Sequence, residues 1–236
     1  MSSSPHPSAA PTTSARYPFT VIVNNPLPMS PPFLPHLPPD AEMATTVRVP
    51  GAQQGQPPLA QIFVARDTRQ WSRHSPVPFW ILTGPDHGSV SSVRPSAQGD
   101  PGGYDVHAPD GTLLAQITRR PGRLLPWPRR IRWSARLDNP AWVCTGKVGT
   151  WYSWLCYVVT SPLWLSFSFA LFLYSLFDGT TSDSSFDSPS RTRWRTRGAG
   201  KALDRRGFPK TYHLDTGRLD PRVAYAMAVL QTWERT

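Results

Sequence analysis

The sequence predicts a mainly β fold, an antiparallel β-barrel around a buried C-terminal helix, interrupted by a hydrophobic helical membrane insertion and preceded by a disordered tail. Short β-rich segments separated by Gly, Pro and Ser occupy much of the chain after residue 59. The chain ends in a short segment that is apolar on all sides, and a long uncharged run lies between Lys147 and Asp178. These features indicate one barrel domain with an apolar insertion.

Residues 1–58 predict a disordered or polyproline-like, Pro/Ser-rich tail. The stretch holds half of the chain's 28 prolines and shows no sustained apolar period. Such a composition buries too little surface to offset the entropy of the chain. Prolines interrupt every candidate apolar stretch, so no secretory signal is indicated. The barrel domain is therefore predicted to span residues 59–236.

Several brief apolar or β-branched segments predict strands. The clearest unit is a hairpin over 104–119, in which two alternating runs flank Pro109-Asp110-Gly111. Asp-Gly between alternating runs predicts a tight primed turn, because glycine adopts positive φ without strain. Further strands are predicted at 61–65, 79–82, 90–93, 201–203 and 211–214.

The pattern R-x-R-W-x-x-R occurs twice, at 130–136 and 191–197, on either side of the apolar run. Alternation along a strand would turn Trp133 and Trp194 inward and leave the arginines in an outer row. Each cation near an anionic membrane surface contributes about 1 kcal/mol to binding. The alternative is that these arginines only solvate the outer faces of barrel strands. The predicted lipid-facing set is Arg130, Arg132, Arg136, Arg191, Arg193, Arg195 and Arg197.

Residues 148–177 predict a membrane insertion, because a helix of about 20 apolar residues crosses a bilayer. Pro162 divides the run, and basic residues flank both ends, which favours a hairpin that returns to the cytoplasmic face or helices lying in the interface. A single span and a buried core segment are the alternatives. A Ser/Asp-rich loop is expected at 178–190. The residues expected in the membrane are Trp151, Trp154, Leu155, Leu163, Trp164, Leu165, Phe167, Phe169, Leu171 and Phe172.

The C-terminal segment predicts a helix with Asp220 as N-cap and Pro221 at the first helical position. Val223–Leu230 is apolar without a break, so the helix should be buried on every side. It is too short to span a bilayer. We expect it to run through the middle of the barrel.

The hairpin YDVHAPDGTLLAQI (104–117), the strand RIRWSARL (130–137) and the closing YHLDTGRLDPRVAYAMAVL (212–230) resemble the tubby-like C-terminal superfamily, which includes phospholipid scramblases and LURP-one-related proteins. The chain is also similar to uncharacterised actinobacterial membrane-associated proteins of this layout. The resemblance implies a closed antiparallel barrel around a hydrophobic C-terminal helix. In scramblases the hydrophobic segment is the terminal helix itself and an acidic segment is proposed to bind calcium, so calcium-dependent scrambling is not implied here.

The net charge of +10 and a pI near 10.3 predict an acidic partner. No nucleotide-binding or hydrolase motif occurs, and no metal or cofactor is expected. Asp86 and His87, with Ser89 nearby, have the residue types of a hydrolytic triad, but closeness in sequence says nothing about triad geometry, and a loop histidine is the expectation. Cys144 and Cys156 do not form a disulfide framework. We therefore expect a non-enzymatic lipid-binding or scaffolding module attached to a membrane, with its bulk on the cytoplasmic face. The alternatives are an adaptor that recruits a partner protein through its Pro-rich tail, and nucleic-acid binding through the arginine rows.

Overall fold

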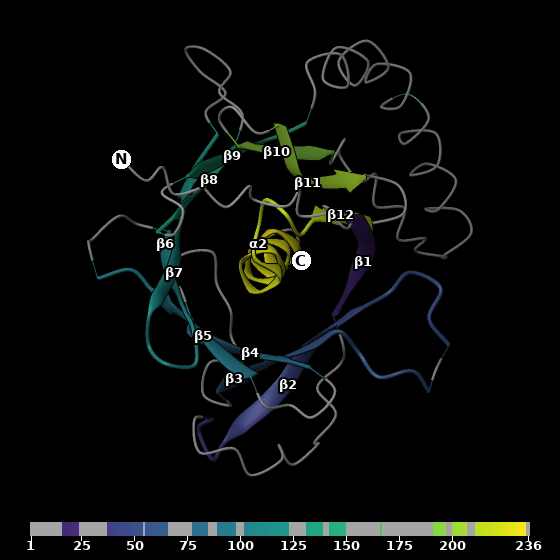
Figure 1. Ribbon diagram of the computed structural model, residues 1–236, viewed down its shortest axis with the longest axis vertical. Coiled ribbons are helices and arrows are strands. Elements are labelled where there is room, and N and C mark those ends of the chain that lie inside the picture. The colour runs from purple at the N-terminus through teal and green to yellow at the C-terminus, as the bar shows by residue number, and fades with distance from the viewer. Residues whose placement is uncertain are drawn as a thin grey trace, which may run out of the picture.

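The computed structural model describes residues 16–23, 37–53, 55–65, 77–84, 89–97, 102–122, 131–138, 142–149, 166, 191–196, 200–206 and 211–234. These residues form a closed antiparallel barrel in which strands consecutive in the chain are neighbours in the sheet, and β1 pairs with β12 to close it (Figure 1). The strands are β1 (Arg16–Val23), β2 (Ala41–Arg48), β3 (Ala60–Ala65), β4 (Phe79–Thr83), β5 (Ser89–Pro95), β6 (Gly103–His107), β7 (Leu113–Arg120), β8 (Arg132–Leu137), β9 (Val143–Val148), β10 (Thr192–Thr196), β11 (Gly200–Arg206) and β12 (Thr211–Asp215).

Helix α2 (Pro221–Trp233) runs through the middle of the barrel, as predicted (Figure 1). The side chain of Asp220 caps it by accepting a hydrogen bond from the backbone N–H of Arg222 at 2.8 Å, and Pro221 occupies the first turn, where its missing N–H is not needed. Residues 223–231 are all buried, because the barrel wall surrounds the helix. The helix therefore supplies the apolar centre that the inward side chains of the strands pack against.

Aromatic contacts hold the two ends of α2 to the wall. Phe19 of β1 stacks on Tyr212 of β12 with ring centres 5.2 Å apart, and it meets Tyr225 of the helix edge-on at 5.1 Å. Phe79 of β4 meets Trp233, at the other end of the helix, at 5.2 Å. Aromatic pairs in these geometries add about 0.5–1.5 kcal/mol each beyond their burial.

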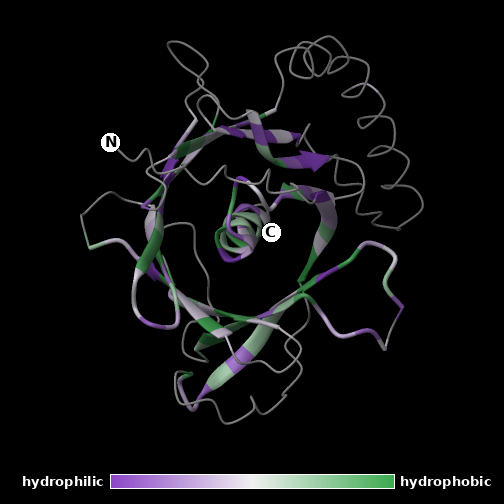
Figure 2. Cartoon of the chain, viewed as in Figure 1, coloured by the Kyte–Doolittle hydropathy of each residue, from purple (hydrophilic) through white to green (hydrophobic). Residues whose placement is uncertain are grey.

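The outer wall differs in character around the barrel. On β2–β5 a second apolar cluster, separate from the central core, includes Met43, Phe63, Leu82 and Val90, with Leu37 packed against it. In Figure 2 the strands β3 and β4 accordingly carry mostly hydrophobic residues, whereas hydrophilic residues gather on β10 and β11. Strand β10, which follows residues 150–190 in the chain, belongs to this hydrophilic part of the wall and is paired with β9, which precedes them.

The predicted strands at 61–65, 79–82, 90–93, 201–203 and 211–214 are confirmed by β3, β4, β5, β11 and β12. The hairpin is confirmed by β6 and β7, but its turn is not a two-residue primed turn. The N–H of Gly111 donates to the carbonyl of Ala108, and Gly111, the fourth residue of that turn, has a positive φ of 84°. This is the longer hairpin loop in which a left-handed residue follows the turn.

Two predicted boundaries are wrong. Residues 16–23 and 41–48, assigned to a disordered tail over 1–58, form β1 and β2 and lie between β12 and β3 in the sheet. Without these two strands the barrel would have open edges, and pairing them removes unsatisfied backbone groups. Residues 1–15 and 24–36 lie outside the described residues. Val148, taken as the start of the apolar run, is the last residue of β9.

Candidate functional site

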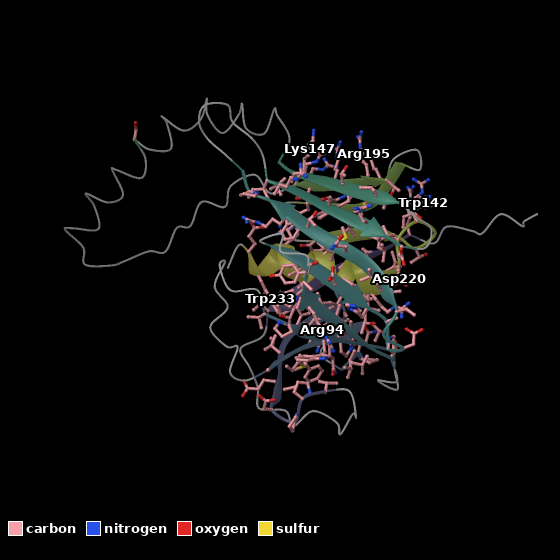
Figure 3. All side chains as sticks on the ribbon, turned by 90° about the vertical axis from the view of Figure 1, so that its left-hand side faces the viewer. Arg94, Trp142, Lys147, Arg195, Asp220 and Trp233 are labelled. Carbon is pink, nitrogen blue, oxygen red and sulfur yellow. The ribbon has the colours of Figure 1, made fainter. Side chains whose placement is uncertain are left out.

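A row of four cations crosses the outer face of β7, β8, β9 and β10. Arg120 lies directly opposite Arg132, Arg132 opposite Lys147, and Lys147 opposite Arg193. We call Arg120, Arg132, Lys147 and Arg193 the cationic row. Its first three members are exposed and Arg193 is half-buried. Lys147 extends away from the barrel on the same side as Arg195 (Figure 3).

The repeated R-x-R-W-x-x-R pattern explains how the sequence builds this row. Its two copies lie on β8 and β10, the two neighbours of β9, and Trp133 and Trp194 both lie opposite Gly146. Both tryptophans are buried, with 2% and 0% of their surface exposed, as the alternation predicted. A Cβ at residue 146 would lie 2.5 Å from Cδ2 of Trp194, so the glycine makes room for the indole. With the tryptophans inside, the flanking arginines face outward.

At the β10 end of the row the charge is partly balanced. Asp204 of β11 lies opposite Arg193, and its Oδ2 is 3.3 Å from Nη2 of Arg191. His213 lies opposite Asp204 on β12, and its pKa is lowered by burial and by the charge of Arg206. No acidic residue is opposite Arg132 or Lys147 in the described strand pairings. Like charges directly opposite one another in a sheet destabilise it, so these two positions favour an external anion.

The structure places the predicted lipid-facing residues in different surroundings. Arg132, Arg136 and Arg195 are exposed, Arg193 is half-buried within the row, and Arg191 is paired with Asp204. Arg130 and Arg197 lie outside the described residues. Two members of the row, Arg120 and Lys147, were not among the predicted set. The predicted hairpin ends at residue 119. Extending the alternation of its second strand to residue 120 would have placed Arg120 on the outer face.

The described residues on either side of residues 150–190 lie side by side. Val148 pairs with Thr192, and beyond this pair the N–H of Gly149 donates to the carbonyl of Arg191 at 2.9 Å. We call the end of the barrel where these residues lie the insertion rim; β7 ends there and β8 begins there. The cationic row is at this rim, because the Lys147–Arg193 pair is the next pair along β9 and β10 from the Val148–Thr192 pair.

The ten residues predicted to enter the membrane, Trp151, Trp154, Leu155, Leu163, Trp164, Leu165, Phe167, Phe169, Leu171 and Phe172, lie outside the described residues. Within the described part of the chain, no helix has both the length and the apolar character to span a bilayer. Among the same residues no group of three His, Cys, Asp or Glu is placed to hold a metal ion. Asp86 and His87 also fall outside them.

Two kinds of side chain that could carry activity are buried. Burial raises the pKa of the Cys144 thiol to about 11, so it is protonated at neutral pH and behaves as a small apolar residue. Trp133 and Trp194, which would have to be exposed to stack on nucleic-acid bases, lie inside the barrel. In the folded barrel neither the thiol nor the two indoles are therefore accessible to a ligand outside the wall.

Comparisons with protein families, with curated proteins and with solved structures found no match to this chain.

Proposed function

We propose that this protein is a membrane-attached lipid-binding or scaffolding module of the tubby-like kind, whose cationic row faces anionic headgroups. The observation that carries the proposal is that the row lies at the insertion rim, where the chain leaves β9 toward the apolar run and later re-enters the sheet at β10. The architecture of twelve antiparallel strands around a C-terminal helix is compatible with a tubby-like barrel.

The charge arrangement supports an anionic surface as the partner. Arg132 and Lys147 face one another across neighbouring strands, about 5 Å apart along the sheet, and this proximity is unfavourable unless anions lie over them. A membrane surface supplies many such charges at once. At about 1 kcal/mol for each cation near the surface, the four residues of the row would contribute about 4 kcal/mol.

The sequence between the paired strand ends supports attachment. Residues 148–177 contain no charged side chain. Because Gly149 and Arg191 are hydrogen-bonded, a segment that leaves the barrel here and enters a bilayer also returns here. We propose a re-entrant or hairpin insertion, with the insertion rim toward the bilayer and the rest of the barrel on the cytoplasmic side, which the basic flanks favour.

Flotation with vesicles of phosphatidylcholine and phosphatidylserine tests the proposal. The double substitution Arg132→Gln and Lys147→Gln removes two central charges of the row, and Arg48→Gln with Arg94→Gln removes two charges from β2 and β5. The first variant should bind roughly 30-fold more weakly, from about 1 kcal/mol for each charge, and the second should bind nearly as the wild type does. Equal losses in the two variants would show that only net charge matters and would remove the row from the proposal.

Salt provides a second measurement on the same variants. Surface electrostatic binding weakens as the Debye length falls to about 8 Å at physiological ionic strength. The salt dependence of wild-type binding should therefore be steeper than that of the row variant. Thermal unfolding of each variant serves as the control that the barrel is intact.

A further inference from the structure

Arg205 of β11 faces the interior of the barrel. It lies opposite Thr192 of β10 and Tyr212 of β12, both of which are buried, and only 4% of its own surface is exposed. Its guanidinium carbon is 5.6 Å from the centre of the Tyr212 ring. The next residue, Arg206, pairs with the first residue of β12, so the guanidinium belongs to the interior side of the wall near the insertion rim.

The guanidinium has no carboxylate partner within the described part of the chain. Its neighbour Asp204 faces the outer side of the wall and pairs with Arg191. Nε and Nη1 of Arg205 are both buried, and neither makes a hydrogen bond to a described residue. Arginine side chains stay charged inside proteins, so this charge is not relieved by loss of a proton. A buried charge of this kind is costly unless an anion compensates it.

Polar groups from two other elements lie beside it. Gln231 of α2 donates from Nε2 to Oγ1 of Thr192 at 2.6 Å, and Thr192 is the residue opposite Arg205. The other amide atom of Gln231, Oε1, is buried and has no partner among the residues described. The two amide atoms can exchange places by a half-turn of the side chain, which would present N–H donors instead. In that orientation the hydroxyl of Thr192 donates to Oε1 and holds the amide, so the N–H donors of Gln231 join those of Arg205 in the same part of the interior.

We propose that Arg205, Gln231 and Thr192 form an interior receptor for a phosphate-type oxyanion. A guanidinium is suited to phosphate because it is planar, always charged and has several N–H donors. The amide of Gln231, oriented by the hydroxyl of Thr192, supplies neutral donors from another direction, which a tetrahedral anion with several oxygens can accept. The site is on the opposite side of the wall from the cationic row and does not rest on the function proposed above.

Unfolding of the full chain in inorganic phosphate tests this site, with chloride at equal ionic strength as the reference. A ligand that binds only the folded state raises the unfolding midpoint. The wild-type midpoint should rise with phosphate and then level off. Arg205→Met, which keeps an apolar side chain in the interior, should lose this response and be at least as stable as the wild type without phosphate. The row variant, Arg132→Gln with Lys147→Gln, should keep it.

A second arm identifies the source of the anion. Vesicles that contain phosphatidic acid present the same phosphate group as a lipid headgroup. One outcome is that the vesicles, and not free phosphate, raise the unfolding midpoint of the wild type. If Arg205→Met loses this rise and Arg205→Lys keeps a smaller one, the site is supported and is assigned to a lipid. If neither phosphate nor these vesicles gives a response that depends on Arg205, the proposal is overturned.

Discussion

Gly146→Ala tests how the barrel accommodates the repeated tryptophans. The added Cβ would lie 2.5, 2.7 and 2.8 Å from Cδ2, Cε3 and Cε2 of Trp194, whereas unstrained carbon contacts are about 3.5–4.0 Å. The ring must move by about 1 Å in an interior where the indole is fully buried. Overpacking of this kind costs about 1–3 kcal/mol. Replacing glycine also restricts the unfolded chain, which raises the unfolding free energy by about 0.4–1 kcal/mol. We expect a net loss of about 1–2 kcal/mol in unfolding free energy.

Urea unfolding followed by far-UV circular dichroism measures this loss, and Gly55→Ala is the matched control. A Cβ at residue 55 meets nothing within 4 Å, so the same chemical change there should be neutral or slightly stabilising. Adding Trp194→Phe should reduce the cost of Gly146→Ala by at least about 0.5 kcal/mol, the coupling expected of residues in contact. Equal effects of Gly146→Ala and Gly55→Ala, or strict additivity of Gly146→Ala with Trp194→Phe, would refute the proposed packing.

Three further predictions concern the helix cap, the outer histidine and the buried thiol. Asp220→Ala should lower the unfolding free energy by about 1 kcal/mol, because the cap to the N–H of Arg222 is lost, while Asp220→Asn should retain most of it in the same urea experiment. The pKa of His213 is lowered in the folded state, so the unfolded state binds the proton more readily. As the pH drops below about 6.5, the thermal stability of the wild type should therefore fall more than that of His213→Gln. Parallel pH profiles of the two proteins would contradict this. In the Cys156→Ala variant, Cys144 should resist labelling by maleimide at neutral pH until urea unfolds the barrel, because burial raises its pKa to about 11. Labelling is followed by mass spectrometry, and rapid labelling of the folded protein would count against that burial.

The sequence predicted those parts of the fold that depend on local pattern. The alternation around Trp133 and Trp194, the turn at Gly111 and the fully apolar helix after Asp220 each have a signature within a few residues. Strands β1, β2 and β9 have none. Pro18 lies within β1, β2 holds two successive threonines at 45–46, and β9 contains Gly146. Each is a strand because the strands on either side of it in the closed sheet would otherwise have unpaired edges. Those neighbouring strands lie outside any short stretch of sequence around it.

The candidate site was predictable only in part for a related reason. The arginines at 132, 136 and 195 were placed outside by alternation, and the structure agrees. That Lys147 lies between Arg132 and Arg193 depends on the register of β9 with both neighbours, and that Arg191 is neutralised by Asp204 depends on β11.

The inward position of Arg205 was also hidden from local pattern. Ala202 and Leu203 are consecutive and both buried, because β10 and β11 pair irregularly between Trp194 and Arg195. Counting by twos from Ala202 would turn Asp204 inward, whereas counting from Leu203 turns Arg205 inward, as the structure has it. The choice depends on the register with β10, which a single strand does not contain.

The most direct test of membrane attachment asks whether the apolar run enters a bilayer while the barrel wall stays outside it. In a background of Cys144→Ala and Cys156→Ala, a polarity-sensitive fluorophore would be attached through Leu165→Cys in the run or through Leu113→Cys on the exposed wall of β7. On adding anionic vesicles, the label at 165 should shift to shorter wavelength and be quenched by quenchers on the lipid chains, and the label at 113 should not change. No response at residue 165, or equal responses at both positions, would contradict the proposed attachment.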